Sequence, residues 1–344
     1  MSVSVMPGAI DRLANNVDLT ADEAGAVLRE VMAGEVSETQ TAAFLMGLRV
    51  KGETVAEIVG LARTMRELAA PVTVARKDLL DTAGTGGGRR TFNVSTTAAF
   101  VAAGAGCAVA KHGNRSATSQ SGSADLLEAL GARIDLAPEA VAECIESVGF
   151  GFMFAPRHHA ATRYVVPVRK ELAVRTVFNF LGPLTNPAGA TRQLIGVFDP
   201  AHLETMATAL HQLGGVHALV VSSEDGLDEV SVSGPTHVFE LRDGRVEGRS
   251  VTPAELGLDT VTAETIPAGD PAFNAGVTRR VLAGNDGPER TLVLANAGAA
   301  IYVAGAASTL EQGVRAAEVA IDSGAAEEAL ARYVERTREL AVAA

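Results

Sequence analysis

Apolar residues from Ile10 to Leu68 recur at the three- and four-residue spacing that is typical of amphipathic helices. Thr20 precedes two acidic residues as a helix N-cap does, and Ser37 forms a capping-box pattern with Gln40. This stretch lacks the alternation of apolar and polar positions that indicates a strand. The pattern therefore predicts a small all-helical domain that ends near Pro71.

Beyond Pro71, short apolar runs alternate with helical stretches. Such alternation favours parallel strands with helices on both faces of the sheet. Residues Val238–Val251, which contain Asp243-Gly244, are typical of a hairpin. The predicted fold class is α/β, with a small all-helical N-terminal domain and a large α/β domain around a central, mainly parallel sheet flanked by helices. The predicted strands are 107–110, 150–154, 194–198 and 218–221, and the predicted helices are 95–104, 124–130, 201–213, 275–282, 292–303, 310–323 and 325–341.

Composition limits the class of protein. The 344 residues suit two domains, and with 47% of them hydrophobic and 20% charged a folded core is expected. No apolar run reaches the ~18–20 residues that a membrane-spanning helix needs, so no membrane partner is expected. Cys107 and Cys144 each lie in an apolar stretch, which excludes a disulfide framework and favours a reduced, cytoplasmic location.

Charge is distributed unevenly along the chain. The net charge of −12 disfavours nucleic acid as a partner. Between Arg157 and Arg175, however, seven Arg, Lys or His residues accompany a single acid, Glu171. Such a segment is either a solvated helix face or a site for an anion, and the segment alone does not decide between the two.

A glycine-rich loop, Asp81–Gly88, follows a predicted strand and precedes the helix that opens near Ser95. Glycine lets backbone N–H groups turn toward an anion, and the helix N-terminus adds its positive dipole. The loop has neither the Gly-Lys-Ser/Thr of a Walker loop nor the dinucleotide fingerprint. It indicates a phosphate or diphosphate site, although a tight structural turn has the same composition.

Two further loops are expected at the same edge of the sheet, because the loops after parallel strands meet at the carboxyl ends of those strands. Lys111–Arg115 follows strand 107–110 with a cation, an imidazole and an amide, and small hydroxyl residues continue to Ser123. Glu224–Glu229 follows the strand that ends at Val221 and supplies carboxylates, which suit Mg²⁺. Alone, the first segment is either an anion site, which its two basic residues favour, or a flexible surface loop, and the second is typical of a solvated turn. Together they indicate a site for magnesium and diphosphate.

Several long motifs, in the same order along the chain, resemble the anthranilate phosphoribosyltransferase family. This family belongs to the class of nucleoside phosphorylases and phosphoribosyltransferases with a small helical domain. The resemblance covers nearly the whole chain, and motifs of this length are specific. The matching segments are Gln40–Thr54, Gly84–Gly87, Thr91–Thr96, Lys111–Arg115, Ser121–Asp125, Val168–Leu172, Phe178–Pro187, Asp228-Glu229 and Asn296-Ala297.

The resemblance implies a role for each matching site residue. The residues that would bind 5-phosphoribosyl 1-diphosphate are Gly84, Thr85, Gly86, Gly87, Asn93, Ser95, Thr96, Lys111 and Ser123. The residues that would bind anthranilate are His112, Asn114, Arg169 and Pro183. Arg169 would meet the anthranilate carboxylate, and His112 is a candidate proton acceptor. Two magnesium ions would be held by Ser95, Asp228 and Glu229.

The resemblance also implies an architecture and a reaction. A helical domain, 1–71 with a returning segment at about 170–190, would join two copies into a homodimer. The α/β domain, 72–169 and 191–344, would bind phosphoribosyl diphosphate and magnesium. The reaction would transfer the 5-phosphoribosyl group to the amine of anthranilate, a step of tryptophan biosynthesis. Ribose C1 would become oxocarbenium-like as diphosphate leaves, so positioning and electrostatics would supply most of the rate.

The chain departs from this family at the glycine loop. The family follows Gly-Thr-Gly-Gly with an Asp, a Gly and two more residues, whereas this chain has only Gly88–Arg90 there, which lacks the acid. Two alternatives therefore stay open. One is another acceptor, in a transferase of the same fold or a pyrimidine nucleoside phosphorylase, although Asn114 and Arg169 argue against the phosphorylase. The other is a pseudoenzyme that binds phosphoribosyl diphosphate without turnover, although Lys111 and Asp228-Glu229 argue for catalysis.

Overall fold

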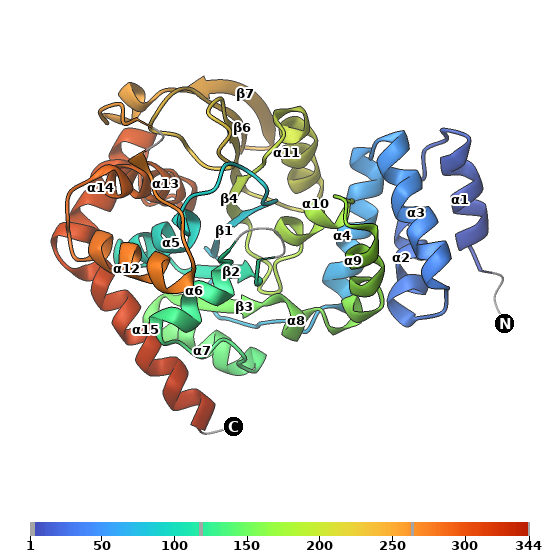
Figure 1. The fold of residues 1–344 in the computed structure, drawn as a ribbon, viewed down its shortest axis with the longest axis horizontal. Helices are drawn as coiled ribbons and strands as arrows, with labels where there is room; N and C mark the ends of the chain where they lie inside the picture. The colour runs from blue at the N-terminus through green and yellow to red at the C-terminus, as the bar shows by residue number, and fades with distance from the viewer. Residues whose placement is uncertain (1–3, 117–119, 263–264, 343–344) are drawn as a thin grey trace.

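The computed structural model describes residues 4–116, 120–262 and 265–342, and it consists of a helical part beside a larger α/β part (Figure 1). Thr20, Ser37 and Thr54 each begin a helix with a capping box; the N-cap at Thr20 and the box at Ser37 were expected. In each box the N-cap hydroxyl accepts from the N–H three residues on, whose Glu or Gln side chain accepts from the N-cap N–H. The helical part consists of helices α1 Met6–Ala14, α2 Ala21–Ala33, α3 Glu38–Lys51 and α4 Val55–Leu68.

A seven-stranded sheet forms the centre of the α/β part, in the order β3-β2-β1-β4-β5-β6-β7. The pairs from β3 to β5 are parallel, and only the β6–β7 hairpin adds antiparallel pairs. The predicted fold class and the predicted hairpin are therefore confirmed. The strands are β1 Leu80–Gly84, β2 Val109–Gly113, β3 Phe150–Phe154, β4 Arg192–Gly196, β5 His217–Ser223, β6 Thr236–Arg242 and β7 Arg245–Val251.

Two apolar cores lie on the two sides of the sheet, because alternate residues of a strand point to opposite faces. Leu194 and Leu219 belong to the core shared with α5 and α13, whereas Ile195 and Val220 belong to the core shared with α11 and the helical part. The remaining helices are α5 Val94–Gly104, α6 Ser123–Leu130, α7 Pro138–Val148, α8 Ala155–His158, α9 Val166–Leu172, α10 Phe178–Leu184, α11 Leu203–Gln212, α12 Pro271–Leu282, α13 Pro288–Ala304, α14 Leu310–Asp322 and α15 Ala325–Val342, with 3₁₀ turns η1 Ala160–Tyr164, η2 Pro200–His202 and η3 Pro253–Leu256.

The second strand differs from the sequence prediction. We expected a strand at 107–110 followed by a loop that carries Lys111 and His112, and this was wrong. Strand β2 pairs with β3 in parallel from Val109 opposite Phe150 to Gly113 opposite Phe154, so Lys111 and His112 lie within the sheet. Helices α7, α8, α9 and α10 were also missed.

The helical part meets the α/β part through a segment near the middle of the chain. Helix α9 packs against α3, and η1 packs against α2. The proposed division at residue 71, with a returning segment at about 170–190, stays a prediction. Cys107 and Cys144 are buried free thiols, as expected.

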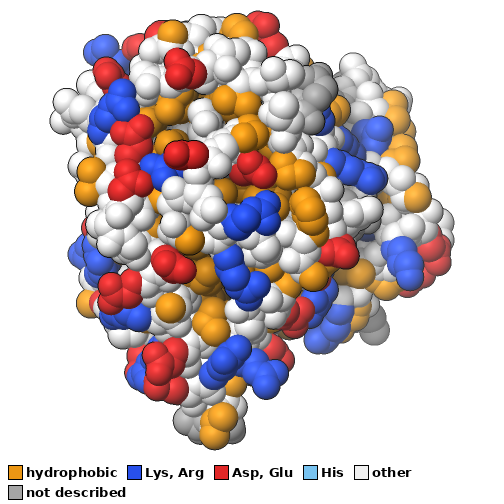
Figure 2. All heavy atoms as spheres, turned by 60° about the vertical axis from the view of Figure 1, so that its left-hand side comes forward, with side chains coloured by type: hydrophobic (Ala, Val, Ile, Leu, Met, Phe, Trp, Pro, Cys, Tyr) orange, Lys and Arg blue, Asp and Glu red, His pale blue; other side chains and the backbone are white. Residues whose placement is uncertain are grey.

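The face of the molecule shown in Figure 2 carries acidic, basic and apolar side chains. On this face, acidic and basic side chains alternate with apolar groups. No helix in the described part of the chain is both long and apolar enough to cross a membrane.

Candidate active site

The glycine loop lies across the carboxyl ends of β1 and β4. The Thr85 N–H donates to the carbonyl of Gly196 at 2.8 Å, and the Thr85 hydroxyl accepts from the Phe198 N–H at 3.2 Å. A Cβ on Gly88 would lie 2.5 Å from Oδ1 of Asp228. The close approach requires glycine at this position, and it brings the predicted diphosphate loop into contact with the predicted metal pair.

Asp228 and Glu229 are densely surrounded, although each keeps some exposed surface. Burial raises the pKa of the Asp228 carboxyl, against the opposing effects of the Arg175 charge and a hydrogen bond from the Gly86 N–H. Burial and then the charge of Asp228 raise the pKa of Glu229 to about 8, although Lys111 opposes this. Two carboxylates have therefore lost much of their water and also repel each other, and a bound cation would relieve both effects.

The carboxylate oxygens of Asp228 and Glu229 suit magnesium better than a softer metal. In the described ranges, no three His, Cys, Asp or Glu side chains gather as a metal site. Two carboxylates with the Ser95 hydroxyl would leave coordination positions for phosphate and water, which is how Mg²⁺ usually binds beside a diphosphate. The residues present therefore fit the expected cation.

Lys111 is buried at this edge and links three elements. Its ammonium donates to the carbonyl of Thr82 and to the Thr82 hydroxyl, the latter at 3.0 Å, and it approaches the Ser95 hydroxyl at 3.4 Å. Burial lowers the pKa of Lys111 to about 8, although Asp81 and Glu229 oppose the shift. A buried cation thus stands between the end of β1 and the start of α5.

Asp81 has a role that sequence reasoning missed. Its carboxylate accepts from the His112 N–H at 3.1 Å and from the Asn186 amide at 2.8 Å. Burial raises the pKa of Asp81 to about 6, and Lys111 opposes this. The network ties β1, β2 and the segment after α10 together. The signal that could have revealed this role is the position of Asp81, an acid directly after the apolar Leu79-Leu80.

Asn93 and its neighbours form the start of α5. The Asn93 side-chain oxygen accepts from the Ser121 hydroxyl at 2.8 Å and from the Asn274 amide at 3.0 Å, and its Nδ2 donates to the Ser121 carbonyl. Thr96 is fully buried in α5, whereas Ser123 is partly exposed at the start of α6. Sequence reasoning did not single out Asn274, which lies on the distant helix α12.

His112 is hydrogen-bonded to α10 at Gly182, the residue before Pro183. The His112 Nδ1 donates to the carbonyl of Gly182 at 3.1 Å, and Nε2 is buried without a partner among the described residues. Burial, followed by the neighbouring His159, lowers the pKa of His112 to about 3. The ring is therefore neutral. Because a carbonyl accepts, Nδ1 carries the hydrogen and Nε2 carries a lone pair.

Arg169 and Asn114 approach from two other elements. Arg169 on α9 lies 5.4 Å from the centre of the Phe178 ring of α10, and its Nε is buried without a partner among described residues. Burial lowers the pKa of Arg169, so an anion beside it would be favourable. Asn114 is exposed after β2, where its oxygen accepts from the Arg115 N–H. No hydrogen bond, ion pair or ring contact joins Asn114, Arg169 and His112 among the described residues.

Arg89 anchors the glycine loop to the acidic loop Glu224–Glu229. The Arg89 N–H donates to the carbonyl of Gly226 at 2.7 Å, and the Arg89 guanidinium lies 3.6 Å from Asp225. Asp225 also accepts from the Ser231 hydroxyl at 2.9 Å. Arg89 thus joins the two loops.

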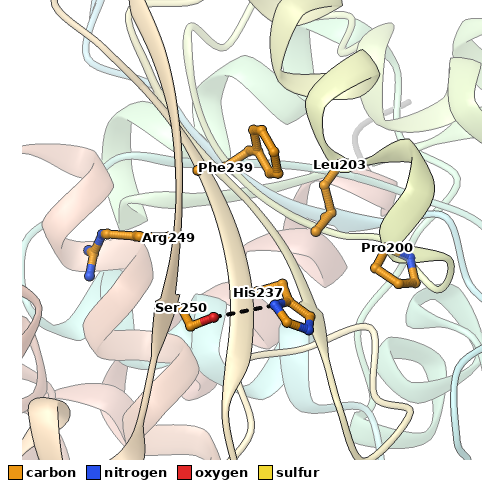
Figure 3. Close-up of a pocket in the computed structure, with 7 residues that line it drawn as sticks. Pro200, Leu203, His237, Phe239, Arg249 and Ser250 are labelled. Atoms are coloured by element: carbon orange, nitrogen blue, oxygen red, sulfur yellow. Dashed lines mark hydrogen bonds between the residues drawn. The ribbon is translucent and has the colours of Figure 1, made fainter.

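An open pocket of about 470 Å³ lies outside this cluster (Figure 3). It is lined by Pro200 and Leu203 on one side and by His237 and Phe239 of β6 on the other. His237 bonds to Ser250 across the hairpin, so its polar atoms are engaged within the protein. The pocket contains none of the predicted site residues.

Comparisons with known proteins agree with this arrangement. The helical bundle domain model of the glycosyl transferase family matches residues 7–69, and the a/b domain model of the same family matches residues 76–327. The anthranilate phosphoribosyltransferase of Symbiobacterium thermophilum is 52% identical over 336 residues, which are 97% of this chain and 98% of that protein.

Solved structures are similar over the same length. The crystal structure of anthranilate phosphoribosyltransferase from Thermus thermophilus has a TM-score of 0.91 and 48% identity, and covers 96% of this chain and 99% of that one. The Saccharomyces cerevisiae enzyme in complex with PRPP and Mg has a TM-score of 0.90 and 27% identity, and covers 98% of this chain and 99% of that one.

Proposed function

Because the chain belongs to the anthranilate phosphoribosyltransferase family, we propose that the sheet edge described above performs this family's reaction with the residues assigned to it. The enzyme transfers the 5-phosphoribosyl group from 5-phosphoribosyl 1-diphosphate to the amine of anthranilate, a step of tryptophan biosynthesis, and releases diphosphate. The observation that carries the assignment is the placement of Gly88 directly against Asp228, which joins the glycine loop to the carboxylate pair.

The donor is proposed to bind along the glycine loop and the start of α5. Glycines leave backbone N–H groups accessible to phosphate oxygens, and the N-terminus of α5 adds a positive dipole. Lys111 supplies a buried positive charge at the same edge. The proposed donor-binding residues are Gly84, Thr85, Gly86, Gly87, Asn93, Ser95, Thr96, Lys111 and Ser123.

Magnesium is proposed to be held by Asp228, Glu229 and the Ser95 hydroxyl, as two ions. When bound, magnesium neutralises the charge that grows on the departing diphosphate oxygens. The raised pKa values of the two carboxyls support this assignment, because both groups gain from a cation.

The acceptor is proposed to lie between α9, α10 and β2. Arg169 would pair with the anthranilate carboxylate, which would offset the cost of burying its guanidinium. Pro183 and Asn114 would shape the rest of the site. The Nε2 lone pair of His112 would accept a hydrogen bond from the amine, and it can take the proton that leaves when the C–N bond forms.

Positioning and electrostatics would supply most of the rate. The bond from C1 to the diphosphate oxygen breaks while the amine nitrogen bonds to C1, and the positive charge on the ribose needs a nearby nucleophile. An aromatic amine has a free lone pair before it attacks, so no strong base is needed. The neutral state of His112 is consistent with a weak acceptor of the final proton.

A homodimer through the helical part is proposed on the family resemblance. Helix α1 lies at the outer end of the molecule (Figure 1), and a hollow of about 400 Å³ between α1 and α2 is lined by Val5, Ala9 and Val27. Light scattering on the purified chain tests this. The proposal predicts the mass of two copies, and the mass of one copy at micromolar concentration would contradict it.

The proposed function is tested by the loss of anthranilate fluorescence with phosphoribosyl diphosphate, with and without Mg²⁺. We expect anthranilate consumption and diphosphate release that both require Mg²⁺. No consumption by folded protein that still binds phosphoribosyl diphosphate would indicate a pseudoenzyme. Consumption of another aromatic amine, but not of anthranilate, would indicate a different acceptor.

A further inference from the structure

Arg175 reaches the glycine loop from the segment between α9 and α10. Its Nη2 donates to the carbonyl of Gly87 at 3.1 Å, and its guanidinium carbon lies 4.2 Å from the centre of the Phe198 ring. Arg49 of α3 donates to the Arg175 carbonyl, which holds this segment to the helical part. The positively charged guanidinium of Arg175 thus lies against the loop that is proposed to bind diphosphate, although its backbone is held to the helical part.

The guanidinium of Arg175 lies close to both Gly87 and Asp228. A Cβ on Gly87 would lie 1.9 Å from Nη2, so the guanidinium packs directly on the loop backbone. Arg175 is also close enough to Asp228 for its charge to act on that carboxyl. The side chain is exposed, and among described residues its hydrogen bond to Gly87 uses one of five guanidinium donors.

We propose that Arg175 is a binding residue for the diphosphate group of the donor. The proposal rests on the proposed function and adds a residue to the donor site. A planar guanidinium can give two parallel hydrogen bonds to a phosphate group, and stacking on Phe198 fixes its plane before the ligand arrives. Arg89, a cation of the shortened loop, is turned toward Asp225 instead.

A second reading of the same contacts is purely structural. Arg175 would then hold the Gly87 carbonyl and keep the loop in shape without touching the ligand. Glutamine separates the two readings, because its amide can still donate to Gly87 but carries no charge. Lysine provides the opposite case, because it keeps the charge but loses the planar fork and the stacking.

The test is a calorimetric titration of the full-length chain with inorganic pyrophosphate in the presence of Mg²⁺. We expect Arg175→Gln to weaken pyrophosphate binding about 10- to 100-fold, the range for a lost charged hydrogen bond. Arg175→Lys is expected to retain more affinity than Arg175→Gln. Arg245→Gln, at an exposed arginine of β7, is the matched control and should bind as the wild type does.

Three outcomes would overturn the assignment. Wild-type affinity in folded Arg175→Gln would mean that the charge does not reach the ligand. Equal losses in Arg175→Gln and Arg175→Lys would mean that the shape of the side chain, and not its charge, supports the loop. A wild-type chain that binds no magnesium pyrophosphate would contradict the proposed function as well. Thermal unfolding of each variant shows whether its fold is intact.

Discussion

Glu57 in the helical part and Glu229 at the sheet edge are both surrounded by protein, but their partners differ. The Glu57 carboxylate accepts from Lys51 at 3.0 Å, from the Leu19 N–H at 2.9 Å and from the Thr54 N–H at 2.8 Å. Glu229 instead lies beside a second carboxylate, and its pKa is raised to about 8. Two acids that are densely surrounded by protein therefore differ in the charge of their neighbours.

The difference shows that the partner of a buried charge, and not burial itself, indicates function. Glu57 has a cation and N–H donors from its own chain, so it stabilises the helical part without any ligand. Glu229 has a neighbour of like charge, Asp228, and Lys111 offsets this only in part. An acid in that state is suited to bind a cation from outside.

Removal of the charge at Glu229 is expected to have the largest effect on activity. Glu229→Gln should lower kcat/KM about 100-fold or more, since the cation contributes several kcal/mol to the transition state. Steady-state anthranilate consumption at saturating Mg²⁺ measures this. The thermal midpoint should not fall, because the substitution relieves repulsion with Asp228. An unchanged kcat/KM would contradict the role of Glu229.

Removal of the charge at Glu57 is expected to lower the stability of the protein and to leave its activity unchanged. Glu57→Gln leaves the buried Lys51 with only the exposed carboxylate of Asp18 as a charged partner, which should lower the free energy of unfolding by about 3 kcal/mol. Urea unfolding followed by circular dichroism measures the loss. Activity per folded molecule should stay near that of the wild type. A stable Glu57→Gln protein with lost activity would reverse the comparison.

His112 is a buried base whose lowered pKa is expected to make the stability of the protein depend on pH. Burial lowers the pKa of His112 to about 3, so the folded ring stays neutral while the unfolded ring binds a proton below its ordinary pKa of 6.5. The stability contributed by the neutral ring is therefore complete above pH 6.5 and is lost as the pH falls from 6.5 toward 3. Between pH 7 and pH 5, this ring should account for about 2 kcal/mol of the loss.

Urea unfolding of the wild type and of His112→Asn at both pH values measures this contribution. The variant should lose about 2 kcal/mol less than the wild type over the same pH range. His159→Asn is a useful second variant, because burial also lowers the pKa of His159 to about 4. Equal pH dependence in all three proteins would show that these rings do not stay neutral on folding.

The smallest effect is expected at the exposed end of the Glu57 network. Asp18 contacts Lys51 at 2.7 Å, but 65% of the Asp18 side chain is exposed. Asp18→Asn should therefore lower the free energy of unfolding by less than about 1 kcal/mol, as for other exposed ion pairs. The same urea titration measures it. A loss as large as that of Glu57→Gln would mean that Asp18, and not Glu57, is the main partner of Lys51.

Local sequence signals predicted the elements that carry the site. The capping patterns at Thr20 and Ser37 gave correct helix starts, because a cap depends on residues a few positions apart. The alternation of strands and helices predicted the parallel sheet, and with it the common edge where the glycine loop meets Asp228. The long motifs were sufficient to identify the family.

Contacts between distant residues could not be predicted in the same way. Lys111 was expected in a loop, because its burial depends on a register with Phe152 that is set by strand pairing. Arg175 appeared only as one charge of a basic segment, because its contact with Gly87 spans separate parts of the fold. Nor does the sequence show that Glu57 has a cation partner and Glu229 an acidic one.

Asp228 and Glu229 are proposed to hold the cation that accompanies the donor. The most direct test is a titration with Mn²⁺ followed by electron paramagnetic resonance, in the presence of phosphoribosyl diphosphate, on the wild type, Glu229→Gln and Glu57→Gln. We predict that the wild type and Glu57→Gln bind Mn²⁺ with similar affinity, and that Glu229→Gln binds it at least about tenfold more weakly. Equal binding by all three folded proteins would contradict the account.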